Sequence, residues 1–113
     1  MTLQQEFTRS VADLIVWTYN QGYTATFGEA WRTPEQAKLN AASGKGIANS
    51  LHGERLAIDL NLFREGKWLS QSEDHAPIGA YWKTLHAAAR WGGDFKSRPD
   101  GNHYSFSPDG RRA

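Results

Sequence analysis

Residues suited to a protein core recur at steps of three and four in the first part of the chain. They are Leu3, Phe7, Val11, Leu14 and Thr18. This spacing predicts an α-helix that ends near Gly22. Residues 23–30 (YTATFGEA) alternate aromatic or β-branched side chains with small ones, which predicts a strand. The sequence TPEQ at 33–36 combines a capping residue, a proline at the first helical position and a glutamine three residues after the cap, and predicts a helix to about Ala42.

A hairpin is predicted in the middle of the chain. Residues 56–63 (LAIDLNLF) alternate, so a strand there presents its leucines and isoleucine on one face and Asp59 and Asn61 on the other. A turn at 64–67 and a short return strand at 68–69 complete the hairpin.

The remaining segments fix the predicted fold class. Residues 43–50 (SGKGIANS) form a loop, a helix runs from Pro77 to the Trp91-Gly92-Gly93 segment, and residues 103–107 (HYSFS) form a strand. Helices and strands are interspersed without a βαβα rhythm. This order predicts an α+β fold, a small antiparallel sheet with flanking helices.

Composition limits the chemistry of the chain. Its 113 residues suffice for one domain, 1–113, with a polar tail from about residue 108. Without cysteine, a metal must be held by histidine or carboxylate side chains. A formal net charge of +1 argues against a dedicated nucleic-acid-binding protein.

The N-terminal sequence predicts a protein that is not inserted in a membrane. It has no basic segment followed by an apolar stretch, and its longest apolar run is Leu14 to Trp17, far below the roughly 20 residues of a membrane span. We expect a chain made in the cytoplasm without a signal peptide, which acts elsewhere only after release.

Two short segments carry the candidate chemistry. His52 precedes Asp59 by seven residues, and Asp100 precedes His103 by three. A helix would separate positions seven apart by about 10.5 Å along its axis, and a strand would place them on opposite faces. His52 and Asp59 can therefore share a metal only if the chain turns between them, and Gly53 makes a reversal possible.

Each of these residues also has an ordinary structural interpretation. His52 can be a loop histidine, Asp59 can face solvent, and Asp100 between proline and glycine can be a turn residue. His75, in a polar loop, and His86, in a helix, have no partner at a useful spacing and are interpreted as structural.

Together the motifs resemble a family of zinc peptidases. Ser50-x-His52-x6-Asp59, then Trp91-Gly92-Gly93-Asp94-Phe95, then Asp100-x-x-His103 follow the order of motifs in the D-Ala-D-Ala carboxypeptidase and L-alanyl-D-glutamate endopeptidase superfamily, particularly phage endolysins. The segment around Arg32 (WRTPEQ) is similar to the family's arginine-bearing junction. The resemblance covers about residues 27–107 and implies a fold like that of Hedgehog domains and DD-peptidases.

The resemblance also implies roles for individual residues. His52, Asp59 and His103 would bind one Zn²⁺ ion, Asp100 would be the catalytic acid/base, and Arg32 would contact a substrate carbonyl or carboxylate. Two histidines and one carboxylate leave a fourth position for water, as in catalytic zinc sites. Trp91 and Asp94 are interpreted as architectural. The chain departs from the family at Arg55, where the first motif often has glycine.

The function implied is zinc-dependent hydrolysis of a peptide bond in the peptidoglycan stem. We expect an L-alanyl-D-glutamate endopeptidase that acts as a monomeric endolysin on the cell wall, binding the stem peptide in its own cleft. Trp31, Trp68 and Tyr104 are candidate exposed aromatic contacts for the substrate. The alternatives are a D-alanyl-D-alanine carboxypeptidase and a non-catalytic zinc-containing module that binds peptidoglycan.

Overall fold

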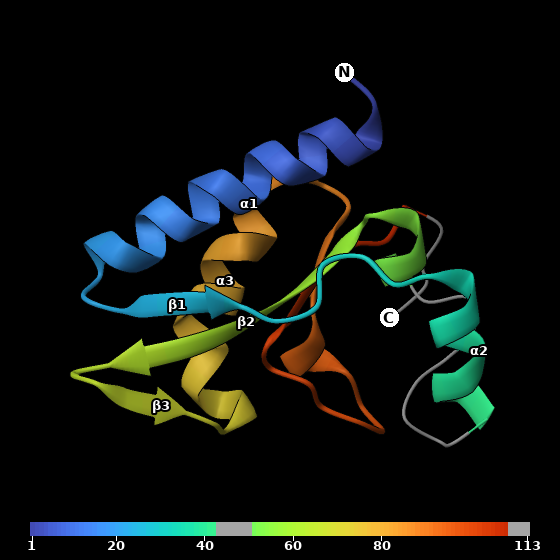
Figure 1. Ribbon diagram of the computed structural model, residues 1–113. Coiled ribbons are helices and arrows are strands. Elements are labelled where there is room, and N and C mark those ends of the chain that lie inside the picture. Colours follow the sequence, from blue (N-terminus) through green and yellow to red (C-terminus); the bar gives the residue numbers. More distant parts are fainter. Residues whose placement is uncertain (43–50, 109–113) are drawn as a thin grey trace.

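The computed structural model describes residues 1–42 and 51–108. The loop expected at 43–50 and most of the polar tail lie outside the described residues. The elements in chain order are α1 (Leu3–Asn20), β1 (Thr24–Phe27), α2 (Pro34–Ala42), the 3₁₀ turn η1 (Leu51–Glu54), β2 (Ala57–Arg64), β3 (Lys67–Leu69), η2 (Ser72–His75), α3 (Ala76–Leu85), β4 (Ala89–Trp91), η3 (Gly92–Asp94) and β5 (His103–Phe106). Helices and an antiparallel sheet are mixed, as predicted (Figure 1).

Strand β2 is the long central strand of the sheet. On one edge it pairs with β1. On its other edge it pairs with β5 near its start and with β3 near its end, and β4 pairs with the far side of β5. All of these pairings are antiparallel. The alternation predicted for β2 is confirmed, because Ile58, Leu60 and Leu62 are buried whereas Asp59 and Asn61 are half-buried.

Helices α1 and α3 contact each other and pack against the sheet (Figure 1). Phe7 of α1 meets the rings of Trp82 and Phe106 edge-on, at centroid distances of 5.7 and 5.1 Å. Trp82 donates its indole N–H to backbone carbonyls at Arg90 and Ser105. These contacts place the core between the two helices and strands β4 and β5.

The N-terminal ends of α1 and α2 lie at the capping residues in the sequence. Thr33 accepts a hydrogen bond from the backbone N–H of Gln36 at 3.0 Å, and α2 begins at Pro34, so the predicted cap is confirmed. Helix α1 has a capping box between Thr2 and Gln5.

In the described part of the chain, no helix has the length and apolar character needed to cross a membrane.

The prediction of one helix from Pro77 to Trp91 is wrong. Helix α3 ends at Leu85, because His86 adopts an extended conformation with φ −161° and ψ 149°. Residues 89–91 then form β4, in which Ala89 lies opposite Phe106 and Trp91 opposite Tyr104. The alanine-rich segment favours a helix locally, but pairing with β5 outweighs that preference.

Candidate metal centre

His52 reaches β2 through a reversal of the chain. It lies in η1, and the N–H of Leu56 donates to the carbonyl of Leu51 at 2.9 Å. Gly53 is not in the left-handed conformation, so the expected role of Gly53 in the reversal is not observed. Arg55 adopts that conformation instead, with φ 59°. The turn folds His52 back beside the start of β2, where its side chain is buried.

Asp59 and His103 meet by strand register. They are directly opposite each other in the antiparallel pair of β2 and β5, where Cβ atoms of facing residues lie about 4.5–5.5 Å apart. On the other edge of β2, Gly28 and Glu29 flank Asp59 with backbone hydrogen bonds of 2.7 and 2.8 Å. The ladder therefore fixes two residues 44 positions apart in the sequence as neighbours.

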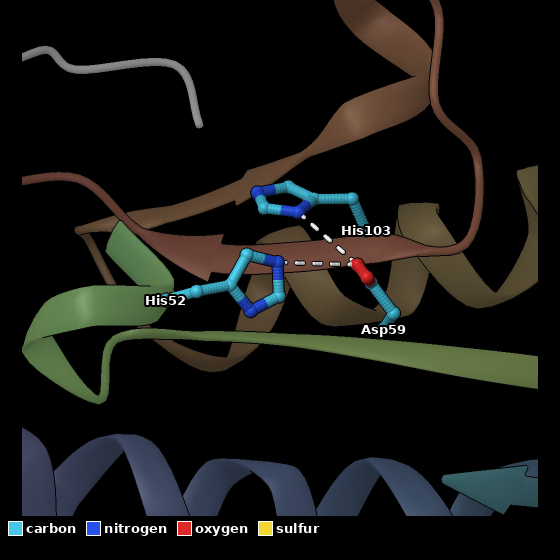
Figure 2. A group of neighbouring side chains, drawn as sticks. All are labelled: His52, Asp59 and His103. Atoms are coloured by element: carbon cyan, nitrogen blue, oxygen red, sulfur yellow. Dashed lines mark hydrogen bonds and ion pairs between the residues drawn. The ribbon is translucent and has the colours of Figure 1, made fainter. Parts of the chain in front are cut away.

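Three potential ligand atoms converge on one point (Figure 2). His52 Nε2 lies 3.4 Å and His103 Nδ1 lies 3.3 Å from the same oxygen of Asp59. Both distances exceed the roughly 2.7–2.9 Å of a charge-assisted hydrogen bond. They match the roughly 3.4 Å between two ligand atoms that each lie about 2.1 Å from a tetrahedral zinc ion, and the ligand nitrogens of the two histidines lie within 4.8 Å of each other. The three residues therefore fit a metal site of two imidazoles and one carboxylate.

The electrostatics of this cluster keep the carboxylate of Asp59 ionised. Burial alone would raise the pKa of Asp59, but hydrogen bonds and charge interactions with His103 and His52 outweigh burial and lower the pKa from 3.8 to about 2. The carboxylate is therefore ionised at every pH where the protein is expected to work, which is the state required of a metal ligand.

A tight turn holds Asp100 beside the three residues. Its carbonyl accepts a hydrogen bond from the N–H of His103 at 3.1 Å, and its own N–H donates to the carbonyl of Gly92 at 2.9 Å. The pKa of the Asp100 carboxyl is raised, first because the group is partly withdrawn from water and then because the Asp59 carboxylate lies near it. Such a carboxyl can take up and release a proton.

Arg32 lies next to His52, but its guanidinium is bound to Glu29. Its Nε donates to Glu29 Oε1 at 2.7 Å, and Nη2 forms an ion pair with the same oxygen. That oxygen lies 3.7 Å from Nδ1 of His52, and the N–H of Arg32 donates to the backbone carbonyl of His52. Glu29 therefore lies between the guanidinium of Arg32 and the imidazole of His52. No sequence motif marks Glu29, because its position depends on the pairing of the chain after β1 with Asp59.

The sequence of residues 43–106 matches the family described as D-alanyl-D-alanine carboxypeptidase. The match spans more than half of the chain and includes His52, Asp59, Asp100 and His103. The chain belongs to this peptidase family. No curated protein matches the chain in sequence.

Two solved structures share the fold of this peptidase. The L-Ala D-Glu endopeptidase ChiX of Serratia marcescens aligns with a TM-score of 0.72 and 17% identity, over 88% of this chain and 79% of ChiX. The vancomycin resistance D,D-pentapeptidase VanY of a VanB-type resistance cassette, a mutant in complex with Zn(II), aligns with a TM-score of 0.62 and 16% identity, over 88% of this chain and 70% of VanY. The fold of the peptidase is therefore that of DD-peptidase-like proteins.

The Trp91-Gly92-Gly93 segment packs against the turn that carries Asp100 and His103 and stabilises it. Trp91 is buried and donates its indole N–H to the carbonyl of Gly101 at 2.7 Å. A Cβ on Gly92 would overlap the carbonyl oxygen of Asp100 and lie 2.8 Å from the Cβ of His103. Glycine at 92 therefore lets the segment pack directly on the turn.

Asp94 of the peptidase points away from these residues. Its carboxylate is half exposed and pairs with Nζ of Lys83 at 2.7 Å. This contact links η3 to α3, a structural role.

The other two histidines have structural contacts. His75 is buried and its Nδ1 lies 2.7 Å from the hydroxyl of Tyr104, and burial lowers the pKa of its imidazole. His86 stacks on Phe106 at a centroid distance of 4.3 Å. Neither belongs to the cluster of His52, Asp59 and His103.

Two of the three aromatic residues expected at the surface are exposed. Trp31 and Trp68 have 46% and 64% of their surface accessible, whereas Tyr104 is fully buried. The expectation for Tyr104 is wrong because β5 lies between β2 and β4 and all four of its residues are buried.

Proposed function

We propose that this peptidase is a zinc-dependent enzyme that hydrolyses a peptide bond in the stem peptide of peptidoglycan. The convergence of His52 Nε2, Asp59 Oδ1 and His103 Nδ1, with Asp100 held beside them, is the observation that carries the proposal. The matching peptidase family and the related peptidases ChiX and VanY support the substrate class.

In the proposed enzyme His52, Asp59 and His103 hold one zinc ion. When bound, zinc is a Lewis acid that activates water and polarises a carbonyl. Asp100 accepts the proton of the attacking water and donates it to the departing amine. Its raised pKa suits both halves of this transfer, because the carboxyl can hold a proton between the two steps.

Arg32 is the proposed contact for the substrate carbonyl or a substrate carboxylate. Glu29 engages Nε and Nη2 of this arginine, so Nη1 is the guanidinium nitrogen that remains for the substrate. The same ion pair holds Arg32 rigidly next to His52. A preorganised donor of this kind stabilises developing negative charge without reorganising during the reaction.

The proposed bond is the one between L-Ala and D-Glu. The L-Ala D-Glu endopeptidase ChiX supports this choice, because it aligns with a higher TM-score and over a larger share of its own length than VanY does. A D-alanyl-D-alanine carboxypeptidase is the second candidate, because the matching family carries that description. A non-catalytic module that binds peptidoglycan is the third, and Asp100 argues against it because a site of two histidines and Asp59 needs no second carboxylate to hold a metal.

Digestion of purified peptidoglycan sacculi, followed by mass spectrometry of the products, tests the proposal. The zinc-loaded protein is expected to create new N-terminal D-Glu. Release of terminal D-Ala would favour the carboxypeptidase, and no cleavage of several wall chemotypes would favour the binding module.

The variant Asp100→Asn separates catalysis from metal binding. We expect it to lower cleavage by at least about 100-fold while zinc content stays at one ion per chain. Asp94→Asn is the matched control, since this carboxylate pairs with Lys83 away from the centre, and its activity should equal that of the parent. Cleavage by Asp100→Asn at the parent's rate would refute the role of Asp100.

The biological role that fits this activity is that of an endolysin. Such a protein would act as a monomer and degrade the cell wall after its release from the cytoplasm. The stem peptide is its proposed partner, without nucleic acid or membrane insertion. The test is lysis: protein added to outer-membrane-permeabilised or wall-exposed cells should lower their turbidity, and Asp100→Asn should not.

A further inference from the structure

A pocket opens where the sheet has a gap next to Asp100. On one edge of β2, residues 57–59 pair with β5 and residues 62–64 pair with β3. Leu60 and Asn61, between these two pairings, have no strand beside them on that edge. A pocket of about 200 Å³ lies at this position. Its volume is smaller than the roughly 300–1,000 Å³ of pockets for drug-sized ligands, so it suits a single ring or residue.

The pocket is lined by neutral polar groups and one exposed indole. The side chains that supply them are Asn61, Trp68, Gln71, Ser72 and Asn102. None of the described residues that line the pocket is lysine or arginine, and Asp100 is the one carboxylate among them. The lining thus offers amide and hydroxyl donors and acceptors beside a flat aromatic face. This combination suits a neutral, hydroxyl-rich ring and disfavours an anion.

The wall of the pocket is part of the turn that carries Asp100. The N–H of Gly101 donates to the hydroxyl of Ser72 at 3.0 Å, and the carbonyl of Asn102 accepts from the N–H of Leu60 at 2.9 Å. A Cβ on Gly101 would overlap the backbone of Ser72. A molecule in the pocket therefore lies directly against the residue to which we assign proton transfer.

Two arginines lie at the η1 end of the centre, where His52 is. Arg32 is beside His52, and Arg55 lies over the ring of Trp31 at 4.6 Å, both at the η1 end. The two sides of an L-Ala–D-Glu bond differ in the same way. The D-Glu side carries carboxylates, whereas the L-Ala side is joined through a lactyl group to an N-acetylated amino sugar.

We propose that the pocket at the gap between β3 and β5 binds the N-acetylated amino sugar to which the first L-Ala of the stem is attached, with Trp68 against its ring. This inference rests on the proposed endopeptidase function. It orients the substrate with its sugar at the Asp100 side and its D-Glu carboxylates at the arginine side. It would also favour the L-Ala–D-Glu bond over the terminal D-Ala bond, because terminal D-Ala residues lie several residues away from any sugar.

Two substrates that differ only in the sugar test the inference. One is N-acetylmuramoyl-L-Ala-D-Glu extended by the rest of the stem, and the other is the same peptide with an acetyl group in place of the muramoyl group. Loss of the aromatic face in Trp68→Ala should lower kcat/KM about tenfold on the muramoyl substrate and less than about twofold on the acetyl peptide. Trp68→Phe should restore most of the loss, because it retains an aromatic face.

Trp31→Ala is the matched control. Trp31 is also an exposed tryptophan near the centre but lies at the η1 end, so its removal should leave the ratio of kcat/KM for the two substrates unchanged. If Trp68→Ala lowers both substrates equally, or lowers neither, the sugar site is refuted while the endopeptidase stands.

A binding measurement tests the pocket without catalysis. The neutral methylamide of N-acetylmuramic acid, in which the lactyl carboxylate is an amide as it is in the wall, is titrated at millimolar concentrations into the isotope-labelled protein, and the indole N–H resonance of Trp68, assigned from Trp68→Phe, is followed by NMR. A saturable shift of this resonance, with the Trp31 resonance unchanged, supports the site even if the parent cleaves neither peptide. No shift refutes it, and a parent that binds the sugar but cuts nothing refutes only the proposed function.

Discussion

Replacing Gly92 by alanine should damage both the stability and the activity of the protein. A Cβ at this position would lie 2.8 Å from the Cβ of His103 and 3.0 Å from the carbonyl carbon of Asp100, against roughly 3.5–4.0 Å for carbon atoms in contact. The turn must therefore move by about 1 Å. Overpacking of this kind costs about 1–3 kcal/mol, and the upper end applies because the obstacle includes backbone. A loss of about 3 kcal/mol lowers Tm by roughly 10 °C in a chain of this size.

The same displacement moves Asp100 and His103 relative to His52. Misplacement of a catalytic group by about 1 Å can lower the rate about 100-fold. Zinc affinity should also fall, measured by competition with a chelating dye. The assays are thermal unfolding in EDTA, zinc titration, and peptide release from sacculi.

Gly53→Ala is the control for this prediction. Gly53 adjoins His52, but the nearest atom to a Cβ there is the carbonyl oxygen of Arg32 at 3.9 Å, and its φ lies outside the left-handed region. Alanine should be neutral or stabilise the protein by about 0.4–1 kcal/mol. Equal effects of the two substitutions on stability, or full activity in Gly92→Ala, would show that the packing of Gly92 on the turn is not what positions Asp100.

Three further predictions concern the metal centre. In the metal-free protein, Asp59→Asn should lower the free energy of unfolding by roughly 2 kcal/mol near pH 6, because folding lowers the pKa of Asp59 from 3.8 to about 2. The folded state holds the lower pKa, so this stabilisation is present above about pH 4 and is lost as the pH falls toward about 2; a difference in urea denaturation that is independent of pH would contradict it. Glu29→Gln should weaken zinc binding about 10–100-fold through His52, whereas Glu35→Gln on α2 should not, and equal affinities would exclude a positioning role for Glu29. Arg55→Gly should be more stable to denaturant than Arg55→Ala by about 1 kcal/mol, because φ at this residue is 59°, and the reverse order would argue against the left-handed turn.

Residues of the candidate metal centre could be predicted from sequence where a local pattern determines the position of the side chain. Alternation in residues 56–63 placed Asp59 on the polar face, and the short spacing of Asp100 and His103 kept those residues together in any tight turn. Both features depend on a few neighbouring residues. The direct pairing of Asp59 with His103 depends instead on the register between β2 and β5, which no local pattern specifies.

The predictions from sequence are wrong where pairing between distant strands outweighs the local preference of the residues for a helix or an exposed position. The alanines before Trp91 favour a helix, yet the chain leaves the helix at Leu85 and residues 89–91 form β4, because β5 offers an edge. Tyr104 was expected at the surface, but all four residues of β5 are buried because the strand lies between β2 and β4. The position of Glu29 beside the centre depends on backbone hydrogen bonds between the chain after β1 and Asp59, and no local sequence pattern predicts these bonds.

Arg55 shows how the chain can depart from the family motif and keep the position of its ligands. The reversal after His52 requires a residue with positive φ, which glycine adopts without penalty and which costs other residues about 1 kcal/mol. Arg55 adopts that conformation at φ 59° while its guanidinium lies 4.6 Å from the ring centre of Trp31. A cation–π contact at an exposed site contributes about 0.5–1 kcal/mol, which offsets most of the backbone cost. Since Trp31 adjoins Arg32, the same contact ties the reversal that presents His52 to the segment that carries the proposed substrate arginine, a connection that glycine at position 55 could not make.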